Sequence, residues 1–211
     1  SITDSAGCVN QNTINSQNIY VNSLPDINIT AAPNPICVGD NAVLSFSSVS
    51  GSGTPPYVVD YLIGGTAASE NVPSAGSSLL VNPITTTTYA LTFVTDSKGC
   101  EAYLTDNTIL VVNEIPQVIL TSPTEICDHD IIQLKFNFTA GTAPWMINYN
   151  FNSTNTIIPI YNAIDSISIS PSSTTIYTIN SVTDNNNCIN NTSQTITITT
   201  HPLPEIVLSG G

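Results

Sequence analysis

The sequence predicts an all-β protein made of tandem immunoglobulin-like β-sandwich domains, and three observations lead to this prediction. Charged residues make up only 8% of the chain, far below the roughly 25% of an ordinary globular domain, and Ser, Thr and Asn fill the polar positions instead. Short apolar runs are separated by turn residues, and no long run has helical periodicity. The sequence also repeats itself at a spacing typical of whole domains rather than of small solenoid units.

The internal repeat gives the expected domain organisation. Three stretches recur in the same order: residues 25–37, 53–61 and 94–100 return as residues 116–127, 141–149 and 182–188. We therefore expect one immunoglobulin-like repeat at residues 25–113 and a second at residues 114–202. The ends carry the same landmarks, since residues 3–8 match residues 95–100. Residues 1–24 are interpreted as the C-terminal part of a preceding repeat, and residues 203–211 as the first strand of a following one.

Each strand expected in the first repeat is a short run of β-favouring residues that ends at a turn signal. These runs are residues 27–30, 42–47, 57–63, 78–81, 88–95 and 108–112. Two of them show the partial alternation of strands with one buried face, and Gly99 supplies a turn position where a positive φ is expected. About seven strands in a repeat of this length fit an immunoglobulin-like sandwich. Proline in the hinges 113–116 and 200–204 favours a stiff rod.

The charge of the chain excludes several classes of partner. The formal net charge is −13, and Lys98 and Lys135 are the only Lys or Arg residues. Nucleic-acid binding needs many cations to neutralise phosphates, and docking on anionic lipid has the same need. No apolar run is long enough to cross a membrane, and the first residues have no basic and apolar segments of a signal peptide. An export signal would therefore lie outside this segment.

Five cysteines become interpretable once the repeat is imposed. Each complete repeat owns two, so we predict the disulfides Cys37–Cys100 and Cys127–Cys188, with Cys8 unpaired within this segment. Such a bond stabilises a domain by about 4 kcal/mol in the chain-entropy model and needs an oxidising compartment. A rival scheme pairs Cys8 with Cys37 and Cys100 with Cys127, which would join neighbouring domains and leave Cys188 unpaired. Cysteine counting does not exclude it.

The landmarks of the first repeat resemble a known family. They are Ile36-Cys-Val-Gly-Asp40, Gly53-Thr-Pro-Pro-Tyr57, Thr87-Thr-Tyr89 and Thr95-Asp-Ser-Lys-Gly-Cys100. This order is similar to the Ig-like or PKD-like repeats of Bacteroidetes surface adhesins, above all the large gliding-motility adhesins of flavobacteria. The second repeat departs from the pattern, with Asp128 in place of Val38 and Asn187 in place of Gly99.

The resemblance implies a location and a function. It implies export by a type IX secretion route, an extracellular position at the cell surface, and a role in adhesion or in spacing an adhesive tip. It also implies O-glycosylation at Asp-Ser-apolar triplets, which this chain carries at Ser5 and Ser166.

Candidate catalytic and metal-binding groups are sparse, and we predict no enzyme activity. The chain has no Gly-x-Ser-x-Gly nucleophile motif, His201 lies in a proline hinge, and His129 is interpreted as part of a solvated turn after Cys127. Zinc is not expected, because no close Cys-x-x-Cys pair occurs. Calcium remains an alternative at residues 184–187, Asp96 and Glu114, although the spaced carboxylates of a dedicated calcium loop are missing. Polar turns are the preferred interpretation.

The sequence predicts a structural function: repeats that form a stiff stalk or filament and display an adhesive surface. Its partners would be neighbouring repeats or identical subunits, with extracellular surfaces or glycans as further candidates. One alternative is a binding module that recognises a glycan or protein through its loops. Tyr57 and Trp145 occupy the same repeat position and could stack on a sugar, but core packing is the preferred interpretation. Another alternative is a filament subunit that exchanges strands, using a hairpin in residues 1–24 and a strand at residues 203–208.

Overall fold

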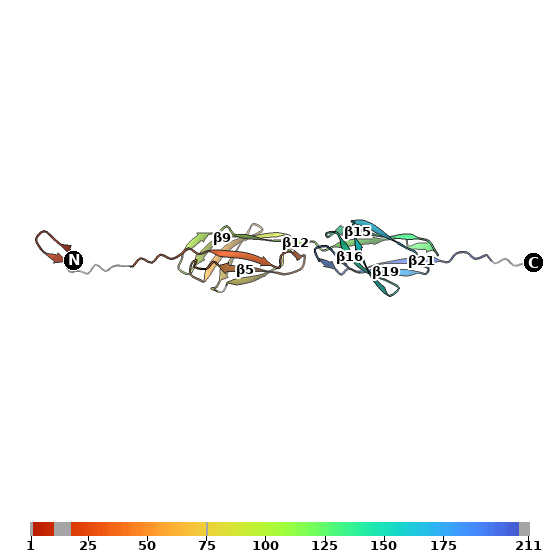
Figure 1. Ribbon diagram of the computed structural model, residues 1–211, viewed down its shortest axis with the longest axis horizontal. Coiled ribbons are helices and arrows are strands. Elements are labelled where there is room, and N and C mark those ends of the chain that lie inside the picture. The colour runs from red at the N-terminus through yellow and green to blue at the C-terminus, as the bar shows by residue number, and fades with distance from the viewer. Residues whose placement is uncertain (1, 11–17, 75, 207–211) are drawn as a thin grey trace, which may run out of the picture.

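The computed structural model describes residues 2–10, 18–74 and 76–206, and every regular element in these residues is a β-strand. Two immunoglobulin-like sandwiches lie end to end along the long axis of the molecule (Figure 1). The fold is therefore all-β, as the composition and the alternating runs predict. No helix among the described residues is long and apolar enough to cross a bilayer.

The first sandwich has a three-stranded and a five-stranded sheet. The first sheet has the order β3-β5-β8, and the second has the order β10-β9-β6-β7 with β11 also paired to β9. This division of strands is that of an immunoglobulin-like domain. The strands are β3 (Ile27–Ala32), β5 (Ala42–Ser48), β6 (Tyr57–Ile63), β7 (Thr66–Val72), β8 (Ser77–Val81), β9 (Thr87–Asp96), β10 (Glu101–Tyr103) and β11 (Asn107–Leu110).

The second sandwich repeats this arrangement. Its three-stranded sheet has the order β13-β15-β18, and its larger sheet has the order β14-β21-β19-β16-β17 with β20 paired to β19. The strands are β13 (Gln117–Thr121), β14 (Glu125–Cys127), β15 (Ile132–Ala140), β16 (Trp145–Phe151), β17 (Thr154–Ile160), β18 (Ile164–Ile169), β19 (Thr175–Thr183), β20 (Ile189–Asn190) and β21 (Gln194–His201).

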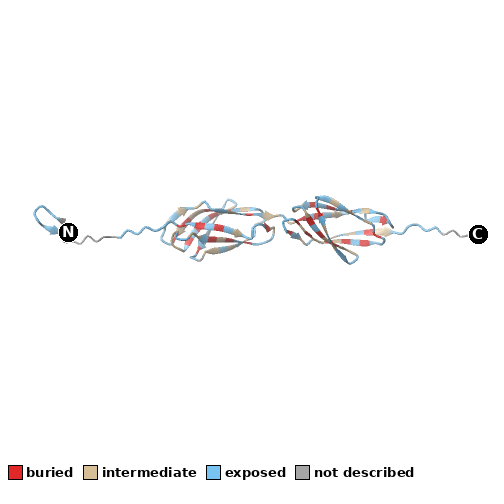
Figure 2. Cartoon of the chain, in the orientation of Figure 1, coloured by how far each residue is buried: buried red, intermediate tan, exposed pale blue. Residues whose placement is uncertain are grey.

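A separate hydrophobic core lies between the two sheets of each sandwich (Figure 2). Alternate residues of β5 and β15 face inward, so that Phe46 and Phe136 are each at most 1% exposed. The facing sheet contributes Val59 of β6 and Ile147 of β16, which are fully buried. The period of two along these strands sends one set of side chains to the core and leaves the polar set in solvent.

The strands predicted in the first repeat correspond to β3, β5, β6, β8 and β9, with ends shifted by at most two residues. The expected strand at residues 108–112 is divided. Its first part is β11, whereas β12 (Val112–Asn113) leaves β9 and pairs in parallel with β4 (Ile36–Cys37). The side chain of Asn34 holds the chain at the division, where its Oδ1 accepts from the Val111 N–H over 3.0 Å.

The described ends of the chain agree only in part with the expectations. Residues 2–10 form the predicted hairpin, in which β1 (Ile2–Thr3) pairs antiparallel with β2 (Val9–Asn10). Residues 203–206, the described part of the strand expected at residues 203–208, are not in a strand here, and residues 207–208 lie outside the described residues; their place in a following repeat stays a prediction. A strand needs a neighbouring ladder to satisfy its N–H and C=O groups, and no partner strand flanks residues 203–206 in the described chain.

Candidate functional site: the junction between the sandwiches

One turn occurs three times in the part of the chain that the structure describes, and each copy ends in a cysteine. We call it the aspartate turn. In each copy, an aspartate Oδ1 accepts from the backbone N–H groups two and four residues further along, over 2.8–3.0 Å. The three copies are Asp4 with Ala6 and Cys8, Asp96 with Lys98 and Cys100, and Asp184 with Asn186 and Cys188.

The backbone of the aspartate turn is also the same in the two sandwiches. Gly99 has a φ of 77° and Asn187 a φ of 62°. Both lie in the left-handed region, which glycine and asparagine adopt most readily. The replacement of Gly99 by Asn187 therefore keeps the turn, although the sequence comparison treats it as a departure from the pattern.

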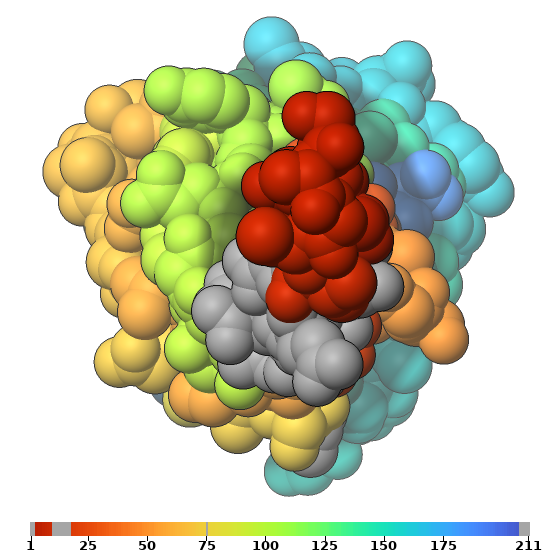
Figure 3. Space-filling model, turned by 90° about the vertical axis from the view of Figure 1, so that its left-hand side faces the viewer, coloured from red at the N-terminus to blue at the C-terminus, as the bar shows by residue number. Residues whose placement is uncertain are grey.

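The aspartate turn lies at the N-terminal end of each sandwich. The second carboxylate oxygen of Asp96 accepts from the Thr54 N–H over 2.8 Å, and that of Asp184 accepts from the Thr142 N–H over 2.9 Å. Both threonines belong to the segment that packs against the incoming chain. Figure 3 views the molecule from its N-terminal side, and the yellow-green segment that includes β9 and β10 is exposed at this end.

The electrostatics of Asp96 follow from this geometry. Burial by itself raises the pKa of the carboxyl group, but the N–H groups of Cys100, Thr54 and Lys98 donate to its charged form and outweigh the burial. The pKa of Asp96 therefore lies below its ordinary value. The carboxylate acts as the acceptor that closes the turn, which explains its position without a metal ion.

A proline, a glycine and an aromatic ring lock the incoming chain onto each sandwich. A Cβ added to Gly53 would lie 2.8 Å from the Cα of Pro25 and 3.0 Å from the ring of Tyr57. In the second sandwich, a Cβ on Gly141 would meet Pro116 and Trp145 at the same two distances. Tyr57 is 2% exposed and Trp145 is 5% exposed. The interpretation of these aromatics as core residues is confirmed.

The other cysteine of each repeat lies at the C-terminal end of its sandwich. Cys37 pairs with Asn113 in the parallel β4–β12 ladder, and Cys127 pairs with His201 in the parallel β14–β21 ladder. Each cysteine N–H also donates to an aspartate three residues further on, to Asp40 over 3.2 Å and to Asp130 over 2.9 Å. We call Cys37 and Cys127 the first cysteines, and Cys100 and Cys188 the second cysteines, of their repeats.

A disulfide joins Cys37 of the first sandwich to Cys188 of the second, with the two Cα atoms 5.6 Å apart. The predicted pairs Cys37–Cys100 and Cys127–Cys188 are therefore wrong, as is the rival scheme with Cys188 unpaired. The first and second cysteines of one repeat lie at opposite ends of the sandwich, so they cannot meet. Cys8, Cys100 and Cys127 are free thiols in the structure.

The disulfide lies beside a short linker. Residues 114–116 connect β12 to β13, and Pro116 is buried against the second sandwich. The side chain of Asn190 donates to the Pro116 carbonyl over 2.8 Å. A surface hollow at the junction is lined by Cys37, Val38, Asp40, Ile115, Asn187 and Ile189. The two sandwiches are thus connected by the main chain and by the disulfide, and Asn190 holds the linker against the second sandwich. No sequence pattern indicated this pairing, because it depends on the position of Cys37 on β4, which pairs with β12 beside the linker.

The two histidines lie beside single carboxylates. Nδ1 of His129 is 3.2 Å from Asp128, and Nε2 of His201 is 3.7 Å from Glu125. His201 is the last residue of β21 rather than part of a hinge. No group of three His, Cys, Asp or Glu side chains in the described residues is arranged to hold a metal ion. His129 has a φ of 71° and occupies the repeat position of Gly39, which has a φ of 95°.

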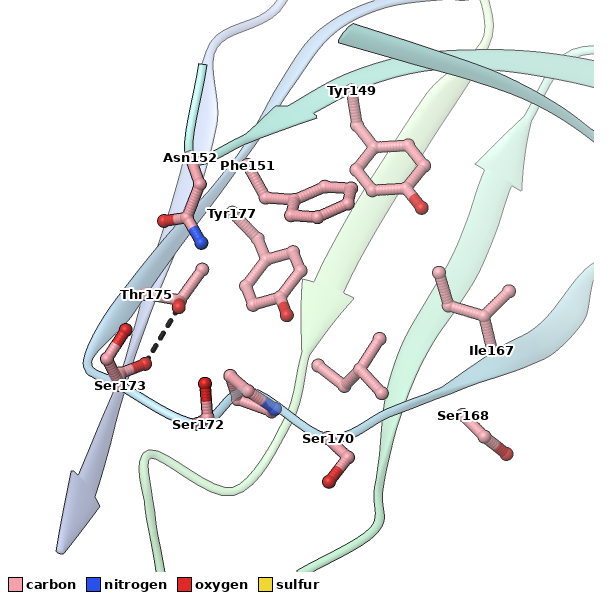
Figure 4. A pocket seen from close by; sticks show the side chains of 12 residues that line it. Tyr149, Phe151, Asn152, Ile167, Ser168, Ser170, Ser172, Ser173, Thr175 and Tyr177 are labelled. Carbon is pink, nitrogen blue, oxygen red and sulfur yellow. Dashed lines mark hydrogen bonds between the residues drawn. The ribbon is translucent and has the colours of Figure 1, made fainter. Parts of the chain in front are cut away.

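An open groove in the second sandwich contains a stack of aromatic rings (Figure 4). Phe151 stacks on Tyr149 and on Tyr177, with ring centroids 6.0 and 5.5 Å apart. Both tyrosines are buried, and burial raises the pKa of each phenol, with a smaller contribution from Tyr149 at Tyr177. Ile63 occupies the position of Phe151 in the first sandwich, so the full stack is not a repeated feature. The rings belong to the core, and mainly serine and asparagine side chains rim the groove.

Both serines of the expected glycosylation triplets are exposed. Ser5 lies in the first aspartate turn, where the Asp4 carboxylate is already engaged by Ala6 and Cys8. Ser166 lies on β18, which is the edge strand of its sheet. Their modification remains a prediction.

Two sandwiches of this connectivity in one chain define a tandem immunoglobulin-like protein. Among solved structures, the chain is similar to a 1.5-MDa bacterial ice-binding adhesin, with a TM-score of 0.47 and 16% identity over 86% of this chain and 67% of that chain. It is also similar to a Ca²⁺-stabilized ice-binding adhesin of an Antarctic bacterium, with a TM-score of 0.48 and 14% identity over 94% of this chain and 55% of that chain. The FN1-FN3 domains of chicken CNTN1 give a TM-score of 0.37 and 15% identity over 85% of this chain and 69% of that chain. No protein-family model and no curated protein sequence matches the chain.

Proposed function

We propose that this chain is a load-bearing stalk segment of an exported bacterial surface adhesin and has no catalytic role. The Cys37–Cys188 disulfide carries this proposal, because it joins the C-terminal end of one sandwich to the N-terminal end of the next. The main chain already crosses this junction, and the bond adds a second covalent path for load, as a stalk under tension would use.

Three further observations support a stalk at the cell surface. The linker of three residues and the buried Pro116 leave little freedom for bending. Disulfides persist in oxidising compartments, which include the exterior of the cell. The net charge of −13 keeps closely spaced chains from associating with one another.

The alternative of strand exchange receives less support from the structure. Residues 27–110 and 117–201 each provide both sheets of a sandwich, so neither requires a donated strand.

The finer expectations rest on the sequence resemblance alone. They are a flavobacterial gliding-motility adhesin, export by a type IX route, and glycosylation at Ser5 and Ser166. The division of the array into repeats at residues 25–113 and 114–202 is also part of the proposal, but it rests on the internal repeat of the sequence. Intact mass of the protein isolated from its natural source tests the glycosylation.

Single-molecule pulling tests the load-bearing function. With handles at the two termini, the disulfide keeps the chain between Cys37 and Cys188, a sequence separation of 151, from extending. At about 3.4 Å per residue, the fully extended length is about 500 Å shorter for the oxidised than for the reduced chain. The Cys37→Ser variant is expected to extend to the reduced length under both conditions, and Cys8→Ser to behave as the original. Equal lengths for the oxidised and reduced chain would refute the proposal.

A further inference from the structure

We propose that Cys127 and Cys100 are the attachment points for adjoining copies of this repeat. In this scheme, the first cysteine of every repeat forms a disulfide with the second cysteine of the repeat that follows. The mechanical consequence described below rests on the proposed stalk function. The pairing itself is argued from the junction that the structure contains.

Cys100 has the same setting as Cys188, which is bonded. Each is held by an aspartate turn, with the cysteine N–H 2.8 Å from Asp96 in one copy and 2.9 Å from Asp184 in the other. The backbone N–H of each aspartate also donates back to the cysteine carbonyl, over 2.9 and 3.0 Å. The turn thus fixes the direction of the cysteine before any bond forms. A repeat that precedes the first sandwich would meet Cys100 as the first sandwich meets Cys188.

Cys127 has the same setting as Cys37, the partner in that bond. Both follow a buried isoleucine, both pair in parallel with the last strand of their sandwich, and both donate an N–H to the aspartate three residues on. Cys127 therefore stands at the C-terminal end of the second sandwich, where a following repeat would attach.

Exposure distinguishes the bonded cysteines from the free ones. Cys188 is fully buried, whereas Cys100 at the equivalent position is partly exposed. Cys37 is partly exposed, whereas Cys127 is exposed. In both comparisons, the bonded copy is the one covered by a neighbouring sandwich. The free copies are the surfaces that a further sandwich of the same kind would cover.

The chemistry of the bond is a thiol–disulfide exchange. The Cys127 thiol and the second cysteine of the next repeat lose two protons and two electrons as their S–S bond forms. A disulfide-containing oxidant, such as oxidised glutathione, accepts them and is released as two thiols.

The pairing rule has a mechanical consequence for an array. Successive disulfides overlap along the chain, because Cys127 lies inside the loop closed by Cys37 and Cys188. A covalent path through the array can therefore cross the Cys37–Cys188 bond, follow the main chain to the first cysteine of the next repeat, and continue through the disulfide of that cysteine. The only main chain on this path is the short segment between the second cysteine of one repeat and the first cysteine of the next. In this chain, the segment from Cys100 to Cys127 is an example. That segment spans about 90 Å when fully extended. Unfolding of single sandwiches would then lengthen the array very little.

Adding one repeat to the full chain tests the rule. A copy of residues 116–203 is inserted after Leu203, which preserves the spacing from linker to sandwich. Its own first cysteine is replaced by serine, and a Ser193→Thr change in the copy marks its peptides by mass. After refolding with oxidised glutathione, non-reducing peptide mapping is expected to link Cys127 to the second cysteine of the inserted copy and to keep Cys37–Cys188.

A matched variant separates this inference from the stalk function. With Cys127→Ser in the extended chain, the second cysteine of the copy should become a free thiol while Cys37–Cys188 remains. A reduced Cys127, or a Cys127–Cys188 bond, in an extended chain whose circular dichroism shows folded sandwiches would overturn the pairing rule. The pulling result for the original chain is unaffected by that outcome.

Discussion

The backbone conformation at single residues creates a difference in stability between the two repeats. His129 adopts a φ of 71° at the position that Gly39 occupies in the first sandwich. The left-handed region costs a non-glycine residue about 1 kcal/mol or more, and the exposed contact with Asp128 contributes little. We expect His129→Gly to raise the free energy of unfolding of the second sandwich by about 0.5–1 kcal/mol, measured by urea denaturation. Gly39→Ala should lower that of the first sandwich, because only its φ of 95° opposes the change. A destabilised His129→Gly variant would contradict this.

The carboxylate of Asp96 makes the stability of the first sandwich depend on pH. Its pKa is lowered in the folded chain, so its contribution to stability is complete above the ordinary carboxyl pKa. That contribution is lost as the pH falls through the lowered pKa. We expect Asp96→Asn to remove part of the stability at pH 6 and to reduce the difference in unfolding midpoint between pH 6 and pH 3. The exposed residue Asp60 supplies the control, Asp60→Asn. An unchanged pH dependence in Asp96→Asn would exclude this role.

At the scale of elements, the close packing of glycine against proline holds each sandwich to its incoming chain. Gly53 and Gly64 share a φ of 55°, but an added Cβ meets Pro25 at 2.8 Å only at Gly53 and meets nothing within 4 Å at Gly64. We expect Gly64→Ala to cost about 1 kcal/mol from the backbone alone and Gly53→Ala to cost about 1–3 kcal/mol more from overpacking. Thermal unfolding of the two variants measures the difference. Equal losses would show that the contact with Pro25 is unimportant.

Some strands could be predicted from their sequences and others could not. β5, β6 and β9 combine alternation with β-branched or aromatic residues, and their positions follow from that pattern. β7 was missed because Ala, Ser, Glu and Asn dominate it; it is an edge strand with few buried side chains. β4 was missed because two residues carry no period, and its parallel pairing with β12 depends on the closed sandwich.

The cysteine pairing could not be derived from the same patterns. The repeat identified which cysteines are equivalent, and this equivalence holds in every hydrogen bond of the aspartate turn. Pairing depends instead on which end of a sandwich each cysteine occupies. That position follows from the β4–β12 ladder, which places Cys37 beside the linker, and from the β9–β6 ladder, which carries Asp96 to the opposite end.

For the whole molecule, the disulfide makes two sandwiches one mechanical unit. It encloses a loop of 151 residues that takes in most of both cores. In the chain-entropy model, closing so long a loop stabilises the folded chain by about 5 kcal/mol.

The pairing itself is the claim on which the stalk depends, and peptide mapping of the oxidised 211-residue chain tests it most directly. Free thiols are alkylated before the chain is cleaved without reductant, and the linked peptides are identified by mass. The account predicts one bond, Cys37–Cys188, with Cys8, Cys100 and Cys127 alkylated. Bonds from Cys37 to Cys100 and from Cys127 to Cys188 would contradict it, because each sandwich would then be closed on itself and the junction would carry load through the linker alone.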